Sequence, residues 1–162
     1  MMGSGKTTVG RALATRLDRP FLDNDVLVRE LTGRAPEAID AAEGEDALHA
    51  VEIAAFRTAA ERTEPAVIAV AGAVVDVAAE RERLHSAGFV VWLRARPEVL
   101  RERIGSGAGR RDDATDLAWL AARAGAREPA YAAVADLVVD VDDRSVAAIV
   151  EEIVAAAAAS AG

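Results

Sequence analysis

The sequence predicts an α/β fold in which helices flank a parallel β-sheet. Segments typical of helices and of strands alternate along the 162 residues, and this alternation is characteristic of parallel sheets. Two apolar runs, at 66–75 and 89–95, are short, β-branched and bounded by breakers, as expected of strands buried on both faces. A glycine-rich loop at residues 3–8 leads directly into a helical pattern, which is a third sign of this fold class.

The first half of the chain is predicted to be mainly helical. Val9, Leu13 and Leu17 have the spacing of one helix face directly after the glycine-rich loop. The short segment 20–25 indicates the end of a strand, and Gly33 ends the helix that follows it. The helices expected in this half are 6–18, 26–33, 36–44 and 45–63.

In the second half of the chain, predicted helices and strands alternate more regularly. A helical segment separates the two apolar runs, and Pro97 begins the next helix. Glycine, arginine and aspartate dominate 105–116, which predicts a mobile loop with the character of a lid. No repeat or linker interrupts the chain, so we expect residues 1–162 to form a single domain. The helices expected here are 77–88, 97–106, 117–125, 129–136 and 146–159, and the strand is 137–141.

Composition argues against several classes of protein. A net charge of −8 argues against nucleic acid as the main partner. No apolar run approaches the roughly 20 residues that cross a membrane. The sequence contains no cysteine, which excludes disulfides and thiolate metal sites and fits a cytoplasmic location. An acidic protein that binds an anion must concentrate its positive charge locally.

The glycine-rich loop has the pattern of a phosphate-binding loop, GxxxxGK[ST], without its first glycine. Lys6 is the only lysine in the chain, and its compact ammonium suits contact with the β- and γ-phosphates of ATP. The Thr7 hydroxyl is expected to ligate Mg²⁺, and Thr8 to donate to the α-phosphate. The residues predicted to bind the nucleotide in this loop are Gly3, Ser4, Gly5, Lys6, Thr7 and Thr8.

A loop of this kind normally follows the central strand of its sheet, and the missing glycine would lie before Met1. Without that strand, the neighbouring strands would lack a partner and their backbone groups would be unsatisfied. We therefore expect a sheet of the phosphate-loop NTPase type whose central first strand is missing from this chain. The favoured explanation is a true N-terminus upstream of Met1, and the alternative is a genuine chain that lacks the strand.

A pair of carboxylates follows the first predicted strand. Asp23 and Asp25 lie two residues apart, so an extended segment would direct both side chains to one side. At the carboxyl edge of a parallel sheet they would face the phosphate loop. One can hold Mg²⁺ and the other can accept a proton from an attacking hydroxyl.

With these motifs in place, the sequence resembles the shikimate kinase family over nearly its whole length. The similar segments are "MMGSGKTTVGRALA", "FLDNDVLVRELTGR", "EGEDALHAVE", "AVIAVAGAVV", "VVWLRARPEVLRERI" and "REPAYAAVADLVVDVDDRS". The resemblance implies ATP-dependent phosphorylation of the shikimate 3-hydroxyl, with Mg²⁺ as cofactor. It also implies a five-stranded parallel sheet and a lid that closes over the nucleotide.

The resemblance also assigns roles to single residues. Asp23 matches the aspartate on the magnesium side, and Asp25 the one that binds the substrate hydroxyls and acts as base. Arg103 matches the arginine that lies against adenine, and Arg110 the lid arginine that reaches the transferred phosphate. Arg127, in "REPAY", matches an arginine that grips the substrate carboxylate. The implied catalytic set is Lys6, Asp25 and Arg110.

Three departures from the family pattern concern the acceptor. His49 stands where the family has an arginine that pairs with the substrate carboxylate, and a histidine cannot replace a bidentate guanidinium. Gly72 lies between Ala71 and Ala73 in place of a triple glycine, and the two added methyl groups are expected to crowd the ring of the acceptor. The lid segment is acidic where it is usually apolar. The residues expected to bind the acceptor are Asp25, His49, Gly72 and Arg127.

These departures leave three hypotheses open: a shikimate kinase, a related kinase for another small hydroxylated acid, and a nucleotide-binding relative without catalysis. The expected partners are ATP and a small anionic substrate, with no nucleic acid or membrane. A monomer is expected, although no pattern bears on oligomeric state. Arg123 is predicted to be a surface charge outside the site.

Overall fold

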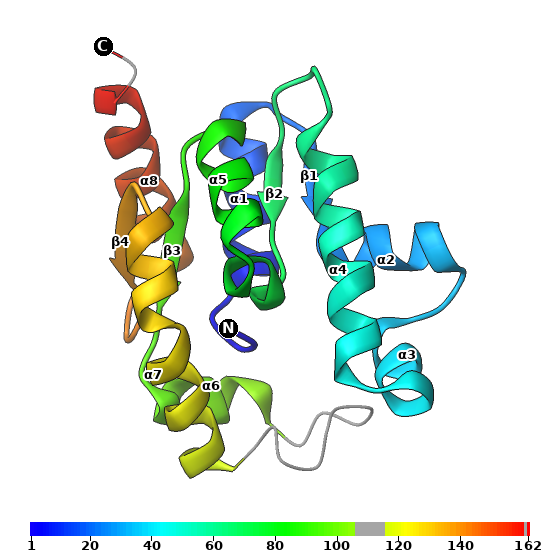
Figure 1. Ribbon diagram of the computed structural model, residues 1–162. Helices are drawn as coiled ribbons and strands as arrows, with labels where there is room; N and C mark the ends of the chain where they lie inside the picture. The colour runs from blue at the N-terminus through cyan, green and yellow to red at the C-terminus, as the bar shows by residue number, and fades with distance from the viewer. Residues whose placement is uncertain (106–115, 161) are drawn as a thin grey trace.

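The computed structural model describes residues 1–105, 116–160 and 162. Helices and parallel strands alternate along the chain (Figure 1), which confirms the predicted α/β class. None of the described helices is long and apolar enough to span a bilayer. The strands are β1 (Phe21–Asp23), β2 (Val67–Ala69), β3 (Val91–Arg94) and β4 (Leu137–Asp140). The helices are α1 (Lys6–Leu17), α2 (Asn24–Thr32), α3 (Pro36–Glu43), α4 (Glu45–Ala60), the 3-10 helix η1 (Gly72–Asp76), α5 (Ala78–Ala87), α6 (Pro97–Ile104), α7 (Leu117–Val134) and α8 (Val146–Ser160).

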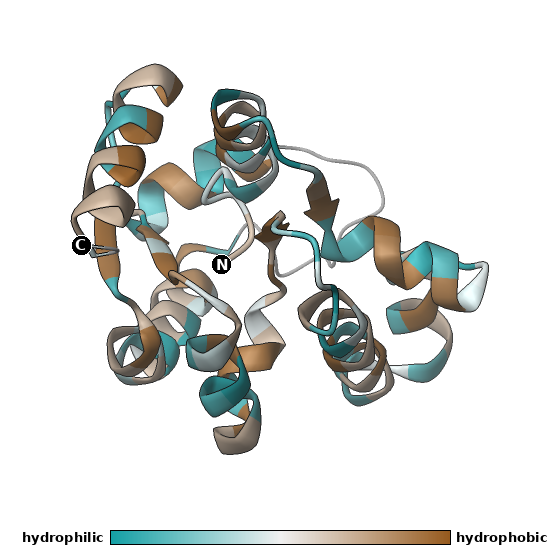
Figure 2. Ribbon diagram, turned by 90° about the horizontal axis from the view of Figure 1, so that it is seen from above, coloured by the Kyte–Doolittle hydropathy of each residue, from teal (hydrophilic) through white to brown (hydrophobic). Residues whose placement is uncertain are grey.

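The four strands form two separate parallel pairs. β1 pairs with β2, with Leu22 opposite Ile68, and β3 pairs with β4, with Trp92 opposite Val138. Among the described residues no strand lies between β2 and β3, so each pair has an open edge there (Figure 1). Figure 2 shows the same division from above, with apolar segments on both strand pairs.

A cavity of about 530 Å³ lies along the two open edges, and we call it the strand slot. Its walls include residues 66–71 around β2 and 88–93 around β3, together with Val9 and Leu13 from α1. These walls are mainly apolar, and they belong to the two edges that lack a partner strand. The structure thus has a gap at the place where the sequence predicts a missing central strand.

The strands are shorter and less buried than the sequence indicates. Of the apolar run 66–75, only Val67–Ala69 is a strand, and the chain then turns into η1 at Gly72. In β3, residues 91–93 are only half-buried, because the strand slot leaves their edge uncovered. In β2, Val67 and Ile68 are also only half-buried, so the prediction that both runs are buried on both faces is wrong for both strands.

One long helix replaces the two that the sequence predicts over 117–125 and 129–136. Pro129 lies inside α7 and removes one helical hydrogen bond. Leu120 and Val134, near the two ends of the helix, are buried against different apolar clusters, and this packing holds both halves on one axis. Side chains four residues apart in α7 consequently share one face.

Two apolar clusters hold the walls of the site in place. Leu100 of α6 packs with Leu120 of α7, and Met1 lies against this cluster. Phe56 of α4 and Val134 of α7 belong to a second cluster, which also includes residues of η1. Both ribbon views place the N-terminus between the α6–α7 pair and α4 (Figures 1 and 2). The start of the phosphate loop is therefore held inside the molecule.

Candidate active site

The glycines of the phosphate loop adopt backbone conformations that other residues rarely reach. Gly3 has φ +77° and Gly5 has φ +89°, both in the left-handed region that glycine tolerates without strain. A Cβ on Gly3 would also lie 2.9 Å from the carbonyl oxygen of Leu100 in α6. The glycines therefore allow the turn and bring the loop against α6. α1 begins at Lys6, so its positive N-terminal end lies at the loop.

The only lysine lies at the mouth of this loop. Lys6 Nζ donates to the carbonyl oxygen of Met1 at 2.8 Å, and the buried Ser4 hydroxyl donates to the same oxygen at 2.9 Å. The ammonium is thus held beside the loop amides by an oxygen acceptor. A phosphate oxygen is an acceptor of the same kind and carries more negative charge, so it can take the place of that carbonyl.

The two residues predicted to hold the metal contact each other. Thr7 Oγ1 donates to Asp23 Oδ2 at 2.8 Å, and so joins the first turn of α1 to the end of β1. The part of the chain that the structure describes contains no cluster of three or more His, Cys, Asp or Glu side chains fit for a metal. Mg²⁺ on a nucleotide does not need one, because phosphate oxygens and waters supply most of its ligands. A threonine hydroxyl beside one carboxylate fits that chemistry.

The aspartate pair is arranged differently from the prediction. β1 ends at Asp23 and α2 begins at Asn24, so Asp25 lies in the first turn of a helix and not on an extended segment. Asp23 Oδ1 accepts a hydrogen bond of 3.0 Å from the backbone N–H of Asp25 and caps α2. The expectation that an extended segment directs both side chains to one side is therefore wrong, because the cap turns the segment into a helix start.

Asp25 still lies within the electrostatic reach of the loop. Desolvation by the surrounding protein and the negative charge of Asp23 raise its pKa above the ordinary value, while the charge of Lys6 lowers it. Desolvation and the charge of Asp25 raise the pKa of Glu52, on α4, to about 7. Arg127 and Lys6 oppose that shift. Asp25 and Glu52 are thus two neighbouring carboxyl groups that accept protons more readily than usual.

Arg127 projects from α7 toward η1 and is held there by Asp76. Its Nη2 donates to Asp76 Oδ2 at 2.6 Å, and its Nε lies 3.1 Å from both carboxylate oxygens. A Cβ on Gly72 would lie 2.8 Å from Arg127 Nη1. Glycine at position 72 therefore leaves room for the guanidinium. Burial tends to lower the pKa of Arg127, but the bond to Asp76 contributes to a net rise.

The flanking alanines differ in where their methyl groups lie. Ala73 is 2% exposed, whereas Ala71 is half-buried. The sequence predicts that both methyl groups crowd an acceptor. The burial of Ala73 places its methyl group in the protein core, so only Ala71 can fulfil that expectation.

His49 and Arg123 approach one carboxylate from two helices. His49 Nε2 lies 3.2 Å from Glu45 Oε1 one turn earlier on α4, and Arg123 of α7 donates to the same oxygen. Desolvation lowers the pKa of His49, and the charges of Arg127 and Arg123 lower it further against the opposing effect of Glu45. Arg123 is only 24% exposed, so it is less of a surface charge than the sequence predicts.

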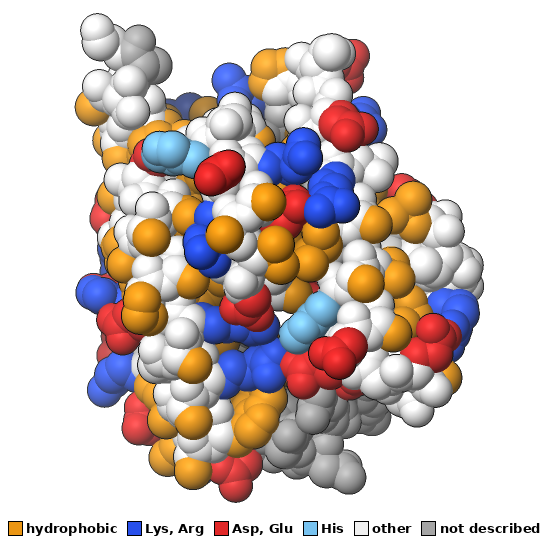
Figure 3. Space-filling view, in the orientation of Figure 1, with side chains coloured by type: hydrophobic (Ala, Val, Ile, Leu, Met, Phe, Trp, Pro, Cys, Tyr) orange, Lys and Arg blue, Asp and Glu red, His pale blue; other side chains and the backbone are white. Residues whose placement is uncertain are grey.

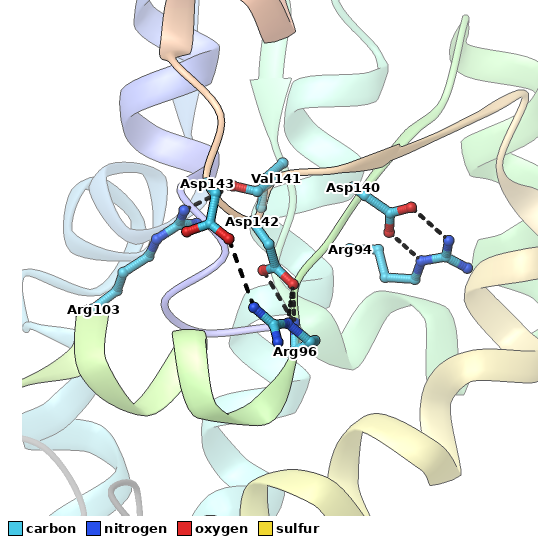
Figure 4. Close-up of polar contacts among 7 residues, drawn as sticks. All are labelled: Arg94, Arg96, Arg103, Asp140, Val141, Asp142 and Asp143. Atoms are coloured by element: carbon cyan, nitrogen blue, oxygen red, sulfur yellow. Dashed lines mark hydrogen bonds and ion pairs between the residues drawn. The ribbon is translucent and has the colours of Figure 1, made fainter.

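Arg103 lies at the carboxyl edge of β4, where several arginines meet aspartates and backbone oxygens (Figure 4). Its Nη2 donates to the carbonyl oxygen of Val141 at 2.8 Å, next to the pair formed by Arg96 and Asp142. Arg103 follows Leu100 by one helical turn, and Gly3 packs against Leu100. This arginine is therefore close to the phosphate loop. Arg110, and residues 106–115 of the predicted lid, lie outside the described residues.

Most sequence-predicted residues thus come together around the N-terminus. Lys6, Asp25 and Arg127 all influence the pKa of Glu52, and Thr7 contacts Asp23. The sequence did not single out Asp76 as a site residue, because it belongs to no recognised motif and its role appears only when α7 meets η1. The sequence also did not show that Arg123 and Arg127 lie on one helix face, because it predicts two helices where the structure has the single helix α7.

Comparison with known proteins gives a consistent result. A family model described as "Shikimate kinase" matches residues 2–158. A shikimate kinase of Symbiobacterium thermophilum is 44% identical over 157 residues, which are 94% of this chain and 90% of that protein. A shikimate kinase of Moorella thermoacetica is 40% identical over 156 residues, 94% of this chain and 87% of that protein.

Solved structures agree with the sequence relatives. The structure of a shikimate kinase from Acinetobacter baumannii in complex with shikimate has a TM-score of 0.86 and 29% identity, and the match covers 94% of this chain and 86% of that one. A shikimate kinase from Aquifex aeolicus has a TM-score of 0.80 and 25% identity, and the match covers 99% of this chain and 94% of that one.

Proposed function

The chain belongs to the shikimate kinase family, and from this premise we propose that it transfers the γ-phosphoryl group of ATP to a hydroxyl of shikimate. The enzyme class is a phosphotransferase with an alcohol group as acceptor. One observation carries the proposal: a lysine at the mouth of a glycine loop, the Thr7–Asp23 pair and the carboxyl group of Asp25 are brought to the same edge of the fold.

The nucleotide end of the site is built from the loop and the start of α1. Backbone N–H groups and the positive end of α1 attract the phosphates. Lys6 exchanges the Met1 carbonyl for β- and γ-phosphate oxygens and stabilises the charge that develops there. Thr7 and Asp23 would hold Mg²⁺, which when bound neutralises charge on the phosphates. Arg103 would lie against the adenine, the role of the family arginine that it matches.

The acceptor end is built from α2 and α7. Asp25 takes the proton of the acceptor hydroxyl as the new oxygen–phosphorus bond forms and the bond between the β- and γ-phosphates breaks. The raised pKa of Asp25 favours this role, because the carboxylate is a stronger base than an ordinary aspartate. Arg127 binds the substrate carboxylate with its guanidinium, which Asp76 orients.

A related kinase with another small hydroxylated acid as acceptor is the second candidate. The observation that favours it is His49, whose pKa is lowered by desolvation, so that it supplies no positive charge for a carboxylate. The loss of one charged hydrogen bond to the substrate carboxylate weakens binding about 10- to 100-fold. This loss weakens the binding of shikimate but does not abolish it.

A coupled assay for ADP release from the full chain tests the proposal. ATP and Mg²⁺ are supplied with shikimate, with other hydroxylated carboxylic acids, or with no acceptor, and Lys6→Ala is the control for background hydrolysis. Shikimate-dependent release that Lys6→Ala loses supports the proposal. Release only with a different acid supports the second candidate. Binding of ATP without transfer to any acceptor overturns both and leaves a non-catalytic nucleotide-binding protein.

A further inference from the structure

α4 and α7 present two opposing stripes of polar side chains near the loop. On α4 the stripe is Glu45, His49 and Glu52, spaced four and three residues apart, and on α7 it is Arg123, Arg127 and Tyr131, each four residues apart. The bond from Arg123 to Glu45 joins the two stripes at one end. Figure 3 shows basic side chains over the α7 side of a hollow in the surface, with a histidine and acidic side chains over the α4 side.

Arg123 and Arg127 act on the same groups in this space. Both lower the pKa of His49, both oppose the rise in the pKa of Glu52, and both oppose the burial effect that raises the pKa of Tyr131. Burial lowers the pKa of the Met1 amine, and both arginines lower it further. Their positive charges therefore converge on one region, although Arg123 and Arg127 are anchored by different carboxylates.

The two guanidinium groups differ in how firmly they are held. Arg127 uses Nε and Nη2 to bind Asp76 and is 11% exposed, so it is fixed in place. Arg123 lies over the ring of Trp119, with its Cζ 5.1 Å from the ring centroid, and reaches Glu45 through Nη2. Stacking on an indole steadies the guanidinium plane without using its N–H groups, which remain able to donate to an acceptor in that plane.

We propose that Arg123, together with Arg127, binds the carboxylate of the small acid substrate, and that Arg123 exchanges the Glu45 carboxylate for that of the substrate. This inference rests on the proposed function and adds to it the residue that determines selection for a carboxylate. His49 is short and supplies no positive charge at this position, so the second guanidinium comes from α7 and not from α4. Two planar guanidinium groups one helical turn apart, those of Arg123 and Arg127, can each donate to an oxygen of one carboxylate.

The test compares an acid with its uncharged amide. Steady-state kinetics and calorimetric binding are measured with shikimate and with the carboxamide of shikimate, for the wild-type chain, Arg123→Gln and Arg127→Gln. Arg16→Gln is the matched control, because it removes one positive charge from an exposed pair between α1 and α8. Arg123→Lys keeps the charge without the planar fork.

With shikimate, Arg123→Gln is expected to raise KM about 10- to 100-fold, with KM for ATP unchanged and kcat within about threefold. With the carboxamide, wild type and Arg123→Gln are expected to agree within about threefold, because the lost interaction is with the carboxylate. Arg127→Gln should behave similarly, Arg123→Lys should fall between wild type and Arg123→Gln, and Arg16→Gln should match wild type.

Two kinetic results overturn the inference. One is a wild-type KM for shikimate in Arg123→Gln, and the other is an equal loss on acid and carboxamide, which indicates a merely structural role. The binding comparison does not require turnover. A wild-type chain that binds the acid more tightly than the carboxamide but transfers no phosphate would overturn the proposed function alone. A wild-type chain that binds both equally overturns the assignment of Arg123.

Discussion

Asp25 lies in the first turn of α2, where Asp23 caps the helix and Lys6 lies within electrostatic reach. Desolvation and the neighbouring carboxylate raise its pKa, and this makes it a better base for a hydroxyl proton than an exposed aspartate. It does not take part in the Thr7–Asp23 contact at the loop. Its proposed role toward the acceptor can therefore be separated by mutation from the proposed role of the loop in nucleotide binding.

Asp25→Asn is expected to lower kcat at least about 100-fold while ATP affinity changes little. General-base catalysis typically accelerates a reaction about 100- to 10,000-fold. Asparagine keeps the size of the side chain but cannot take up the proton. Steady-state kinetics and ATP calorimetry on the same preparation measure the two effects. A parallel loss of turnover and ATP affinity would remove Asp25 from the acceptor role.

Glu52 is expected to make stability depend on pH. Its pKa is raised from 4.5 in an unfolded chain to about 7 in the folded protein, so the folded state binds more protons between these values. The free energy of unfolding therefore falls as pH rises from about 4.5 to about 7. Glu52→Gln should remove this fall and stabilise the protein at pH 8 by at most about 3 kcal/mol.

Urea unfolding of wild type and Glu52→Gln at pH 5 and pH 8 measures the difference. The variant should gain stability relative to wild type at pH 8 and not at pH 5. Equal differences at the two pH values would show that the carboxyl group of Glu52 titrates normally in the folded protein.

At the scale of residues, the sequence predicts the positions of side chains that belong to short motifs. Lys6, Thr7 and Asp23 come together as expected, because a glycine loop and a strand end bring them to one edge of the sheet. Asp76 and Arg123 could not be predicted, because their roles depend on which helix faces meet. Only the packing of α7 against η1 and its side-chain contact with α4 reveals them.

At the scale of elements, the strand slot is the main departure from a continuous sheet. β2 and β3 each have an edge without a partner, and the slot between them is lined by apolar side chains. Unpaired backbone groups and exposed apolar area both lower stability. A strand that fills the slot would pair with both edges and cover residues 91–93 of β3, which are now half-buried.

A chain extended before Met1 by about six β-branched apolar residues, the usual length of a strand, is therefore expected to be more stable than the 162-residue chain. Covering the slot should raise the unfolding temperature by more than about 5 °C. An extension of equal length made of glycine and serine is the control. If the two extensions have the same effect in a thermal scan, the slot does not accept a strand.

Element boundaries were less predictable than element types. The helix α2 begins at Asn24 because Asp23 caps it, so the aspartate pair spans a strand end and a helix start. α7 continues through Pro129 because Leu120 and Val134 are packed at its two ends. Local sequence signals favoured an extended segment through Asp25 in the first case and a helix break before Pro129 in the second. Capping by Asp23 overrode the first signal, and tertiary packing of α7 overrode the second.

At the scale of the whole molecule, the charge distribution agrees with an anionic ligand. The chain carries a net charge of −8, yet Lys6, Arg123 and Arg127 converge on the region around Met1, where all three lower the pKa of the amine. Concentrating positive charge at one place in an acidic protein attracts anions to that place and repels them elsewhere. The α/β class, the missing central strand and the need for a local concentration of positive charge were predicted from the sequence, whereas the contribution of Arg123 was not.

The central claim is that the loop ending in Lys6 holds the phosphates of ATP. Calorimetric titration of the full chain with ATP, with and without Mg²⁺, tests it most directly, with Lys6→Ala as the variant. The account predicts one ATP bound per chain in a magnesium-dependent manner, with affinity reduced at least about tenfold in Lys6→Ala. Binding that is absent, that ignores Mg²⁺, or that is equally strong in wild type and Lys6→Ala would contradict it.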